Sequence, residues 1–136
     1  MKTFRYLLDV NVLVAHAILE HEHHRIAITG LQRVSGRGCK LYTCPIVELG
    51  LLRNAMRIGS LTLAEGLELV ANERINLKLK FIADAVDVSA LPEWVQGYRQ
   101  TTDAYLSALA QASGLKLMTI DKGIPGAERL LPEGNQ

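Results

Sequence analysis

The chain has 136 residues, enough for one domain with its own hydrophobic core. Hydrophobic residues make up 49% of it and charged residues 21%, which is a globular composition and excludes a disordered chain. The formal net charge is +1, so no acidic or basic tail marks a partner, and we predict a single domain over residues 1–136.

The first part of the chain alternates between strand and helix patterns. Residues 4–8 are apolar and aromatic and predict a strand, and Asn11 is a suitable N-cap for a short helix after it. The spacing of apolar residues predicts a second helix over 25–34, and a short strand follows at 40–43. The next predicted helix, over 45–59, has a proline in its first position and a glycine at its end.

The second part continues the alternation. The sequence T-L-A-E at 62–65 is a capping box, and it predicts a helix that runs to about Arg74. Alternating residues at 77–82 predict a half-exposed strand. A helix over 101–114 and a strongly apolar strand over 115–120 follow, and we predict that the residues after this strand form a loop.

This order of elements determines the predicted fold class. Strands that alternate with helices are typical of an α/β sandwich with a mostly parallel central sheet. In such a sheet, binding and catalytic sites form beyond the carboxyl ends of the strands. Polar residues that follow directly after a strand are therefore the first candidates for a functional site.

The location of the protein is also constrained by the sequence. No stretch of about 18 apolar residues predicts a membrane span, and Asp9, Asn11 and His16 interrupt the apolar run near the N-terminus. The two cysteines, Cys39 and Cys44, are too few for a structural zinc site, and we expect them to be reduced thiols. We therefore expect a cytoplasmic protein that does not enter a membrane.

Four acidic residues occupy unusual positions, whereas most of the others, Glu73 among them, are predicted to lie on the surface. Asp9 ends the first strand and Asp121 follows the last one. Glu48 lies in the first turn of its helix and, at about 100° per residue, at the centre of the apolar face. Asp103 lies in the first turn of another helix.

Each of these acids also has a purely structural interpretation. Asp9 could cap the helix that follows it, Asp121 could belong to a turn, and Asp103 could interact with the helix dipole. Glu48 is costly on an apolar face unless it is paired or bound to a metal. Together, however, two strand ends and two helix starts can converge on one cleft, where a cation would offset the repulsion among carboxylates. Oxygen ligands without cysteine favour Mg²⁺ or Mn²⁺, and such a site suits phosphodiester hydrolysis.

Four segments together resemble the PIN-domain ribonucleases, and within them the VapC-type toxins of toxin–antitoxin pairs. The segments are L-L-D-V-N-V-L-V-A, C-P-I-V-E-L-G-L-L-R, T-T-D-A-Y-L-S-A-L-A and L-M-T-I-D-K-G, and in this order they cover nearly the whole chain. The resemblance implies a three-layer α/β/α sandwich and cleavage of single-stranded RNA that depends on Mg²⁺ or Mn²⁺. It also implies a small cognate antitoxin and a homodimer.

The resemblance assigns roles to individual residues. The acidic quartet that binds the metal and carries out catalysis would be Asp9, Glu48, Asp103 and Asp121. Asn11 would orient Asp9, and Thr119 is the polar residue that accompanies the last acid. Some members of the family have a fifth acid shortly after the last one, but Lys122 stands there, which leaves open whether one or two metals bind.

Two other functions remain as alternatives. The chain could be an inactive PIN-like module that binds RNA or regulates another protein, or a different Mg-dependent phosphate hydrolase. Phosphatases of the haloacid-dehalogenase type carry D-x-D after their first strand, and here the second aspartate is replaced by Asn11.

Basic residues and histidines provide candidate contacts to RNA. Arg53, on the polar face of its helix, and His24 are the residues we select, because positive charge near a cleft attracts phosphates. The histidines cluster at positions 16, 21, 23 and 24. This cluster predicts an exposed junction between helices, with a second metal site as the alternative.

Overall fold

The computed structural model describes residues 4–132, so the two ends of the predicted domain, residues 1–3 and 133–136, lie outside it. The elements in chain order are β1 (Arg5–Leu8), α1 (Val10–Ala17), α2 (His24–Gly36), β2 (Lys40–Thr43), α3 (Pro45–Ile58), α4 (Leu63–Asn76), β3 (Lys80–Phe81), α5 (Thr101–Ala112), β4 (Lys116–Thr119) and β5 (Glu128–Arg129). Two short 3₁₀ turns, Val88–Ala90 and Tyr98–Gln100, interrupt the long segment before α5.

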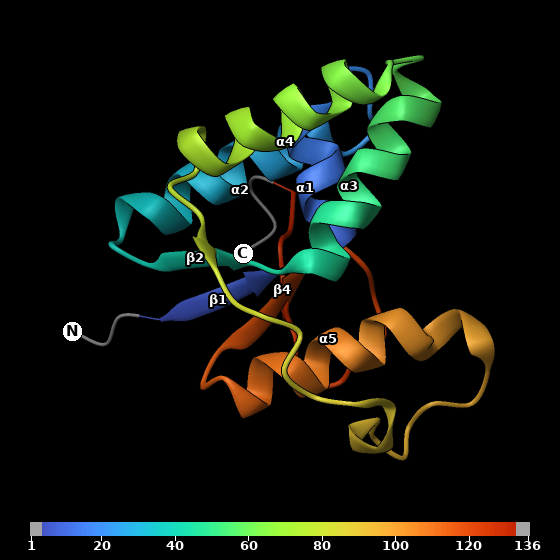
Figure 1. Cartoon of the computed structure of the whole chain (residues 1–136). Helices are drawn as coiled ribbons and strands as arrows, with labels where there is room; N and C mark the ends of the chain where they lie inside the picture. The colour runs from blue at the N-terminus through green and yellow to red at the C-terminus, as the bar shows by residue number, and fades with distance from the viewer. Residues whose placement is uncertain (1–3, 133–136) are drawn as a thin grey trace.

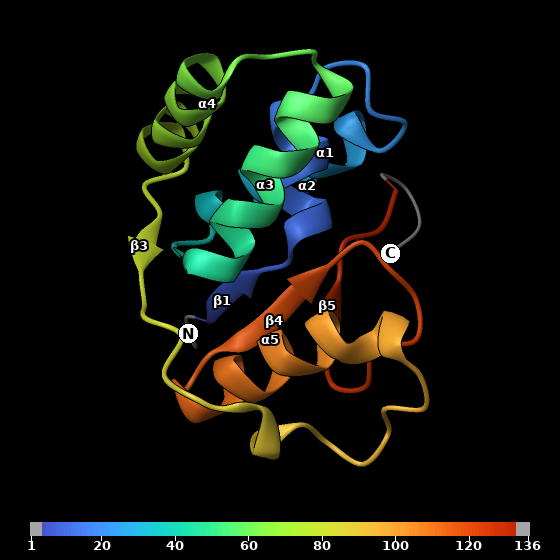
Figure 2. The same cartoon turned by 45° about the vertical axis from the view of Figure 1, so that its right-hand side comes forward.

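The strands form one five-stranded sheet in the order β3-β2-β1-β4-β5, and every neighbouring pair is parallel. Helices α1 to α4 cover one side of this sheet and α5 covers the other, as Figures 1 and 2 show. The three layers confirm the predicted α/β/α sandwich. Because all strands run in the same direction, their carboxyl ends lie along one edge of the sheet.

Strand β1 lies at the centre of the sheet, between β2 and β4. Leu7 and Leu8 are fully buried, and Val12 and Leu13 of the helix that follows are fully buried as well. A strand covered on both sides shows a continuous apolar run. This explains why the sequence around Asp9 is apolar on both sides of a single acid.

The limits of several elements follow the predicted signals. Pro45 occupies the first turn of α3, and Gly59 is its C-cap. The capping box at the start of α4 is present, because Thr62 and Glu65 bond reciprocally to each other's backbone N–H groups. The start of α1 was predicted too late: the helix begins directly after Asp9, so Asp9 and not Asn11 occupies the N-cap position.

Two strands differ from the prediction. Strand β3 comprises only Lys80 and Phe81, although alternation extended over 77–82. Strand β5, Glu128–Arg129, was predicted as loop, and it adds a fifth strand beside β4. A two-residue strand carries too few side chains to show a period-2 pattern, so the sequence could not predict the position of either strand.

Glu73 corrects another prediction, because it is buried with only 7% of its surface exposed. Its carboxylate lies 2.7 Å from Nδ1 of His16, so the pair connects α4 to α1. Burial of an acid is tolerated where a hydrogen-bonded partner is present.

Both cysteines are free thiols. Among residues 4–132, no helix is long and apolar enough to cross a membrane.

Candidate active site

Asp9 stands at the junction of β1 and α1, with no loop between the two elements. Its backbone N–H donates to the carbonyl of Met118 on β4 at 2.9 Å, and its own carbonyl accepts from the N–H of Val12 in α1. The side chain is only 1% exposed. Strand pairing on one side and the start of a helix on the other therefore determine the position of this carboxylate.

Asp103 and Asp121 join Asp9 in one cluster. Asp103 comes from the first turn of α5, on the opposite side of the sheet from α1, and Asp121 follows β4. One carboxylate oxygen of each residue lies within 4.8 Å of the others. Three of the four predicted acids are thus brought together at the carboxyl edge of the sheet, where β1 and β4 end side by side.

The three carboxylates perturb one another. Burial raises the pKa of Asp9 to about 7, Asp103 and Asp121 add to this rise by charge repulsion, and the hydrogen bond from Thr119 opposes it. Burial and, to a smaller extent, repulsion from Asp121 raise the pKa of Asp103 as well. A group of buried like charges of this kind is poised to receive a cation, which would remove the repulsion.

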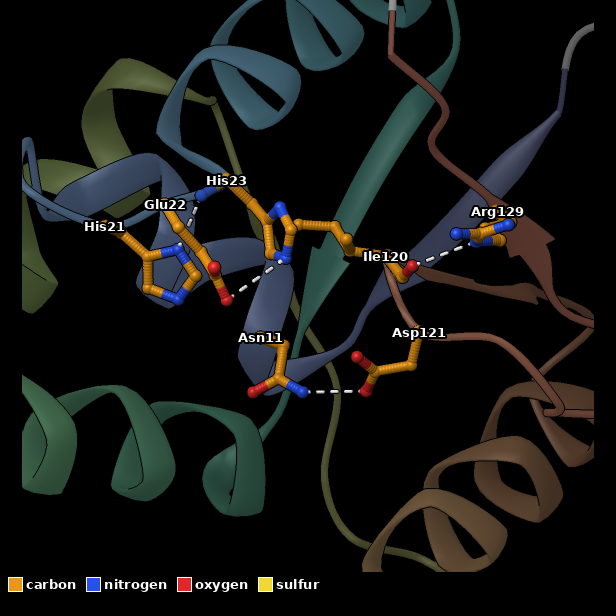
Figure 3. A network of polar contacts seen from close by, with 7 residues as sticks. All are labelled: Asn11, His21, Glu22, His23, Ile120, Asp121 and Arg129. Carbon is orange, nitrogen blue, oxygen red and sulfur yellow. Dashed lines mark hydrogen bonds and ion pairs between the residues drawn. The ribbon is translucent and has the colours of Figure 1, made fainter. Parts of the chain in front are cut away.

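Thr119 and Asn11 hold the cluster in position. The Thr119 hydroxyl donates to Oδ2 of Asp9 at 2.8 Å and accepts from the backbone N–H of Asp121 at 3.0 Å. The amide of Asn11 donates to Oδ2 of Asp121 at 2.7 Å (Figure 3). Asn11 was expected to orient Asp9, but its partner in the structure is Asp121, because Asn11 lies in the first turn of α1 and its amide faces the residue that follows β4 and Ile120.

Strand β5 supports the same region, a role that the sequence did not indicate. The backbone N–H of Leu130 donates to the carbonyl of Thr119 at 2.8 Å. Nε of Arg129 donates to the carbonyl of Ile120 at 3.0 Å, as Figure 3 shows. These two bonds fix the backbone immediately before Asp121.

Glu48 is not part of the cluster in this structure. It lies in the first turn of α3, and both of its carboxylate oxygens bind the guanidinium of Arg74 at the end of α4. The buried face of α3 passes through Val47, Leu51 and Ala55, so Glu48 lies at the edge of that face, towards α4, and not at its centre as predicted. Its role as a metal ligand stays a prediction.

The histidines do not form a metal site among residues 4–132, where the three aspartates are the one group of His, Cys, Asp or Glu close enough to share an ion. His21 accepts a hydrogen bond from the backbone of His23, which also contacts Glu22 (Figure 3). His24 is bonded to the carbonyl of Ala15 and so ties α2 to α1. Arg53 is exposed on α3, and contact of either residue with RNA stays a prediction.

Two further polar groups at the same edge of the sheet were not predicted. The hydroxyl of Thr43, at the end of β2, and Oδ1 of Asp84, after β3, are buried without a hydrogen-bond partner in the described part of the chain. Burial raises the pKa of the Cys44 thiol to about 12, and Asp84 contributes to that rise. Neither Thr43 nor Asp84 belongs to the aspartate cluster.

The donor set of the cluster suits a hard divalent cation. Asp9, Asp103 and Asp121 offer carboxylate oxygens, which Mg²⁺ and Mn²⁺ prefer. Burial and, after it, repulsion from Asp103 and Asp121 raise the pKa of Asp9, and a bound cation would offset both effects. The residues therefore fit a metal ion, and hydrogen bonds that orient the ligands, from Thr119 to Asp9 and from Asn11 to Asp121, are typical of such sites.

Comparison with known proteins identifies the family. A family model described as PIN domain matches residues 6–130. Ribonuclease VapC29 of Mycobacterium tuberculosis (strain CDC 1551 / Oshkosh) is 35% identical over 119 residues, which cover 87% of this chain and 86% of the relative. Ribonuclease VapC38 of Mycobacterium tuberculosis (strain ATCC 25618 / H37Rv) is 36% identical over 125 residues, with the same coverage.

The fold also matches a solved structure. The crystal structure of VapBC2 from Rickettsia felis bound to a DNA fragment from their promoter contains a chain that superposes with a TM-score of 0.65 at 16% identity. The match covers 93% of this chain and 97% of that one. The chain described here therefore belongs to the PIN-domain family and, within it, to the VapC group.

Proposed function

We propose that the protein is a metal-dependent endoribonuclease that hydrolyses RNA phosphodiester bonds and acts in the cytoplasm as the toxin of a type II toxin–antitoxin pair. The observation that carries this proposal is the cluster of Asp9, Asp103 and Asp121, whose oxygens lie within 4.8 Å of one another. The two relatives named ribonuclease support the choice of RNA as substrate.

The side chains of the cluster have separate tasks in this proposal. Asp9, Asp103 and Asp121 would hold Mg²⁺ or Mn²⁺, with Glu48 as a fourth acid. A divalent cation bound there supplies Lewis acidity to the phosphate and lowers the pKa of the attacking water. Thr119 orients Asp9 and Asn11 orients Asp121, and Arg53 would contact the phosphates of the RNA from α3.

An RNA cleavage assay tests the enzymatic part. Pure protein is incubated with structured RNA and either Mg²⁺ or Mn²⁺, and cleavage is compared with that of Asp9→Asn. Glu20→Gln removes one negative charge at an exposed position of the loop after α1 and serves as the control. We expect metal-dependent cleavage by the wild type and by Glu20→Gln, and none by Asp9→Asn. Cleavage that persists in Asp9→Asn or without metal would place the activity outside this site.

The partner and the oligomeric state have tests of their own. We propose a small antitoxin that inhibits the ribonuclease, and a homodimer of the chain. The Rickettsia felis structure, which is of VapBC2 bound to promoter DNA, supports the proposal of an antitoxin. Co-expression with the product of a small neighbouring gene should relieve growth arrest, and light scattering should give twice the mass of the chain. Growth arrest by a catalytically dead Asp9→Asn variant would contradict the toxin mechanism.

A further inference from the structure

Glu48, the one predicted acid that is not part of the cluster, forms an ion pair with Arg74. Nε of Arg74 donates to Oε2 of Glu48 at 2.6 Å, and Nη2 donates to Oε1. Both carboxylate oxygens are therefore engaged by one planar guanidinium, the arrangement that gives arginine–carboxylate pairs their strength. The Glu48 side chain is 14% exposed and that of Arg74 49% exposed.

Several contacts hold the guanidinium at this place. Its Cζ atom lies 5.4 Å from the centre of the Phe81 ring at the end of β3. Leu52 and Val70 line the groove between α3 and α4 in which the pair lies. The first turn of α3 favours an acid and the last turn of α4 favours a base. The pair links the start of α3 to the end of α4, so it lies at the ends of the two helices that are far from their connecting loop.

The pair has a consequence for the aspartate cluster. The carboxylates that raise the pKa of Asp9 are Asp103 and Asp121, and Glu48 is not among them. A carboxylate can bind a small divalent cation only through an oxygen lone pair at about 2.1 Å. A guanidinium that binds both oxygens of Glu48 competes with a cation for those lone pairs.

We infer that Arg74 is a positioning residue that competes with the divalent cation for Glu48. Arg74 holds Glu48 outside the cluster of Asp9, Asp103 and Asp121, and Glu48 can contribute to the metal site only when Arg74 releases it. This inference rests on the metal site of the proposed function. It predicts that loss of Arg74 strengthens metal binding, whereas loss of a residue that supports a ligand would weaken it.

Calorimetric titration with Mn²⁺, in the absence of RNA, tests the sign. Arg74→Gln removes the charge and the two-pronged contact, and we expect it to bind Mn²⁺ about tenfold more tightly than the wild type. Glu48→Gln should bind more weakly than the wild type. Adding Arg74→Gln to Glu48→Gln should change nothing further, because the effect of Arg74 passes through Glu48. Arg57→Gln removes one charge from the exposed face of α3 and should leave the affinity unchanged.

Three results would overturn the inference. Unchanged Mn²⁺ affinity of Arg74→Gln would make the pair a simple link between two helices. Weaker binding would mean that Arg74 supports Glu48 as a ligand. Tighter binding that persists in the Glu48→Gln background would reduce the effect to general electrostatics. Circular dichroism and thermal unfolding verify that each variant is folded. Arg74→Lys keeps the charge but loses the planar fork, so it should bind Mn²⁺ with an affinity between those of the wild type and Arg74→Gln.

A second measurement observes Arg74 directly. The Nε–H signal of Arg74 in NMR spectra should move towards that of a free arginine when Mg²⁺ is added to the wild type. It should stay unchanged when Mg²⁺ is added to Asp9→Asn, and an unchanged signal in the wild type would also overturn the inference. If the wild type binds no Mn²⁺, the proposed function fails together with the inference. If the wild type binds Mn²⁺ and Asp9→Asn does not, the metal site of the proposed function stands. In that case an unchanged affinity of Arg74→Gln would contradict only the inference about Arg74.

Discussion

The hydroxyl of Thr119 lies 2.8 Å from Oδ2 of Asp9, although the two residues are 110 positions apart in the sequence. The hydroxyl oxygen of Thr119 also accepts a hydrogen bond from the backbone N–H of Asp121 at 3.0 Å. One buried hydroxyl thus fixes two members of the cluster relative to each other.

Thr119→Val should lower the free energy of unfolding by about 1–3 kcal/mol, because it removes the donor to Asp9 and the acceptor for Asp121 while keeping the volume. The pKa of Asp9 should rise further, since the Thr119 bond is the larger of the two hydrogen bonds that lower it. Thr43→Val is a matched control, because Thr43 is equally buried and its hydroxyl has no partner among residues 4–132. Urea unfolding should show no loss for Thr43→Val, and an equal loss in both variants would contradict the role of Thr119.

Asp9→Asn should stabilise the metal-free protein above neutral pH. The folded pKa of about 7 lies above the ordinary value of 3.8, so the folded state binds more protons than the unfolded state between these values. The stability of the wild type should therefore fall as pH rises from about 4 to about 7. Asp9→Asn should reduce this slope, leaving the part due to Asp103, and should gain roughly 2–4 kcal/mol at pH 8.

Urea unfolding in EDTA at several pH values measures this difference. Glu20→Gln, the exposed control, should keep the slope of the wild type. A loss of stability in Asp9→Asn at pH 8 would show that the Asp9 carboxylate supports the fold, and it would contradict the predicted cost of its ionisation.

Asn11→Ala should weaken Mn²⁺ binding by about tenfold or more, because the amide that orients Asp121 is lost. Asn11 is exposed, so the thermal unfolding midpoint should change little. Asn72→Ala, at an exposed position of α4, is the control for the loss of an amide. Calorimetric titration measures both variants, and equal affinities would mean that the Asn11–Asp121 bond does not position the ligand.

Glu73→Ala should destabilise the protein by about 3 kcal/mol, since it leaves the half-buried ring of His16 without its partner and opens space between α1 and α4. Glu68→Ala, on the exposed side of the same helix, should change the free energy of unfolding by less than about 0.5 kcal/mol. Chemical denaturation compares the two variants. Equal effects would assign the loss to helix propensity.

The sequence allowed the fold and most of the cluster to be predicted because both depend on local patterns. Asp9 and Asp121 follow strongly apolar strands, and parallel strands bring such residues to one edge of a sheet. Asp103 could be placed there because a helix start in an α/β fold faces the same edge. The partner of Asn11 could not be predicted, because the choice between Asp9 and Asp121 depends on the direction of one side chain within the cleft.

The pairing of the remaining acids depends on contacts between segments. A helical wheel indicates that Glu48 lies near an apolar face, but it does not show that Arg74 follows 26 residues later at the adjacent helix end. Glu73 has an amphipathic context that is typical of surface residues, and only the packing of α4 on α1 buries it. Strand β5 is defined by backbone bonds to β4 and has no side-chain pattern of its own.

The order of the three clustered aspartates along the chain also has a consequence for biosynthesis. Asp9 leaves the ribosome early, but its neighbour β4 and the residues Asp103 and Asp121 are synthesised last. A nascent chain that ends at α4 carries the first acid and lacks the strand that completes the cleft. The aspartate cluster therefore cannot form until translation has passed β4 and Asp121, which lie in the last part of the chain.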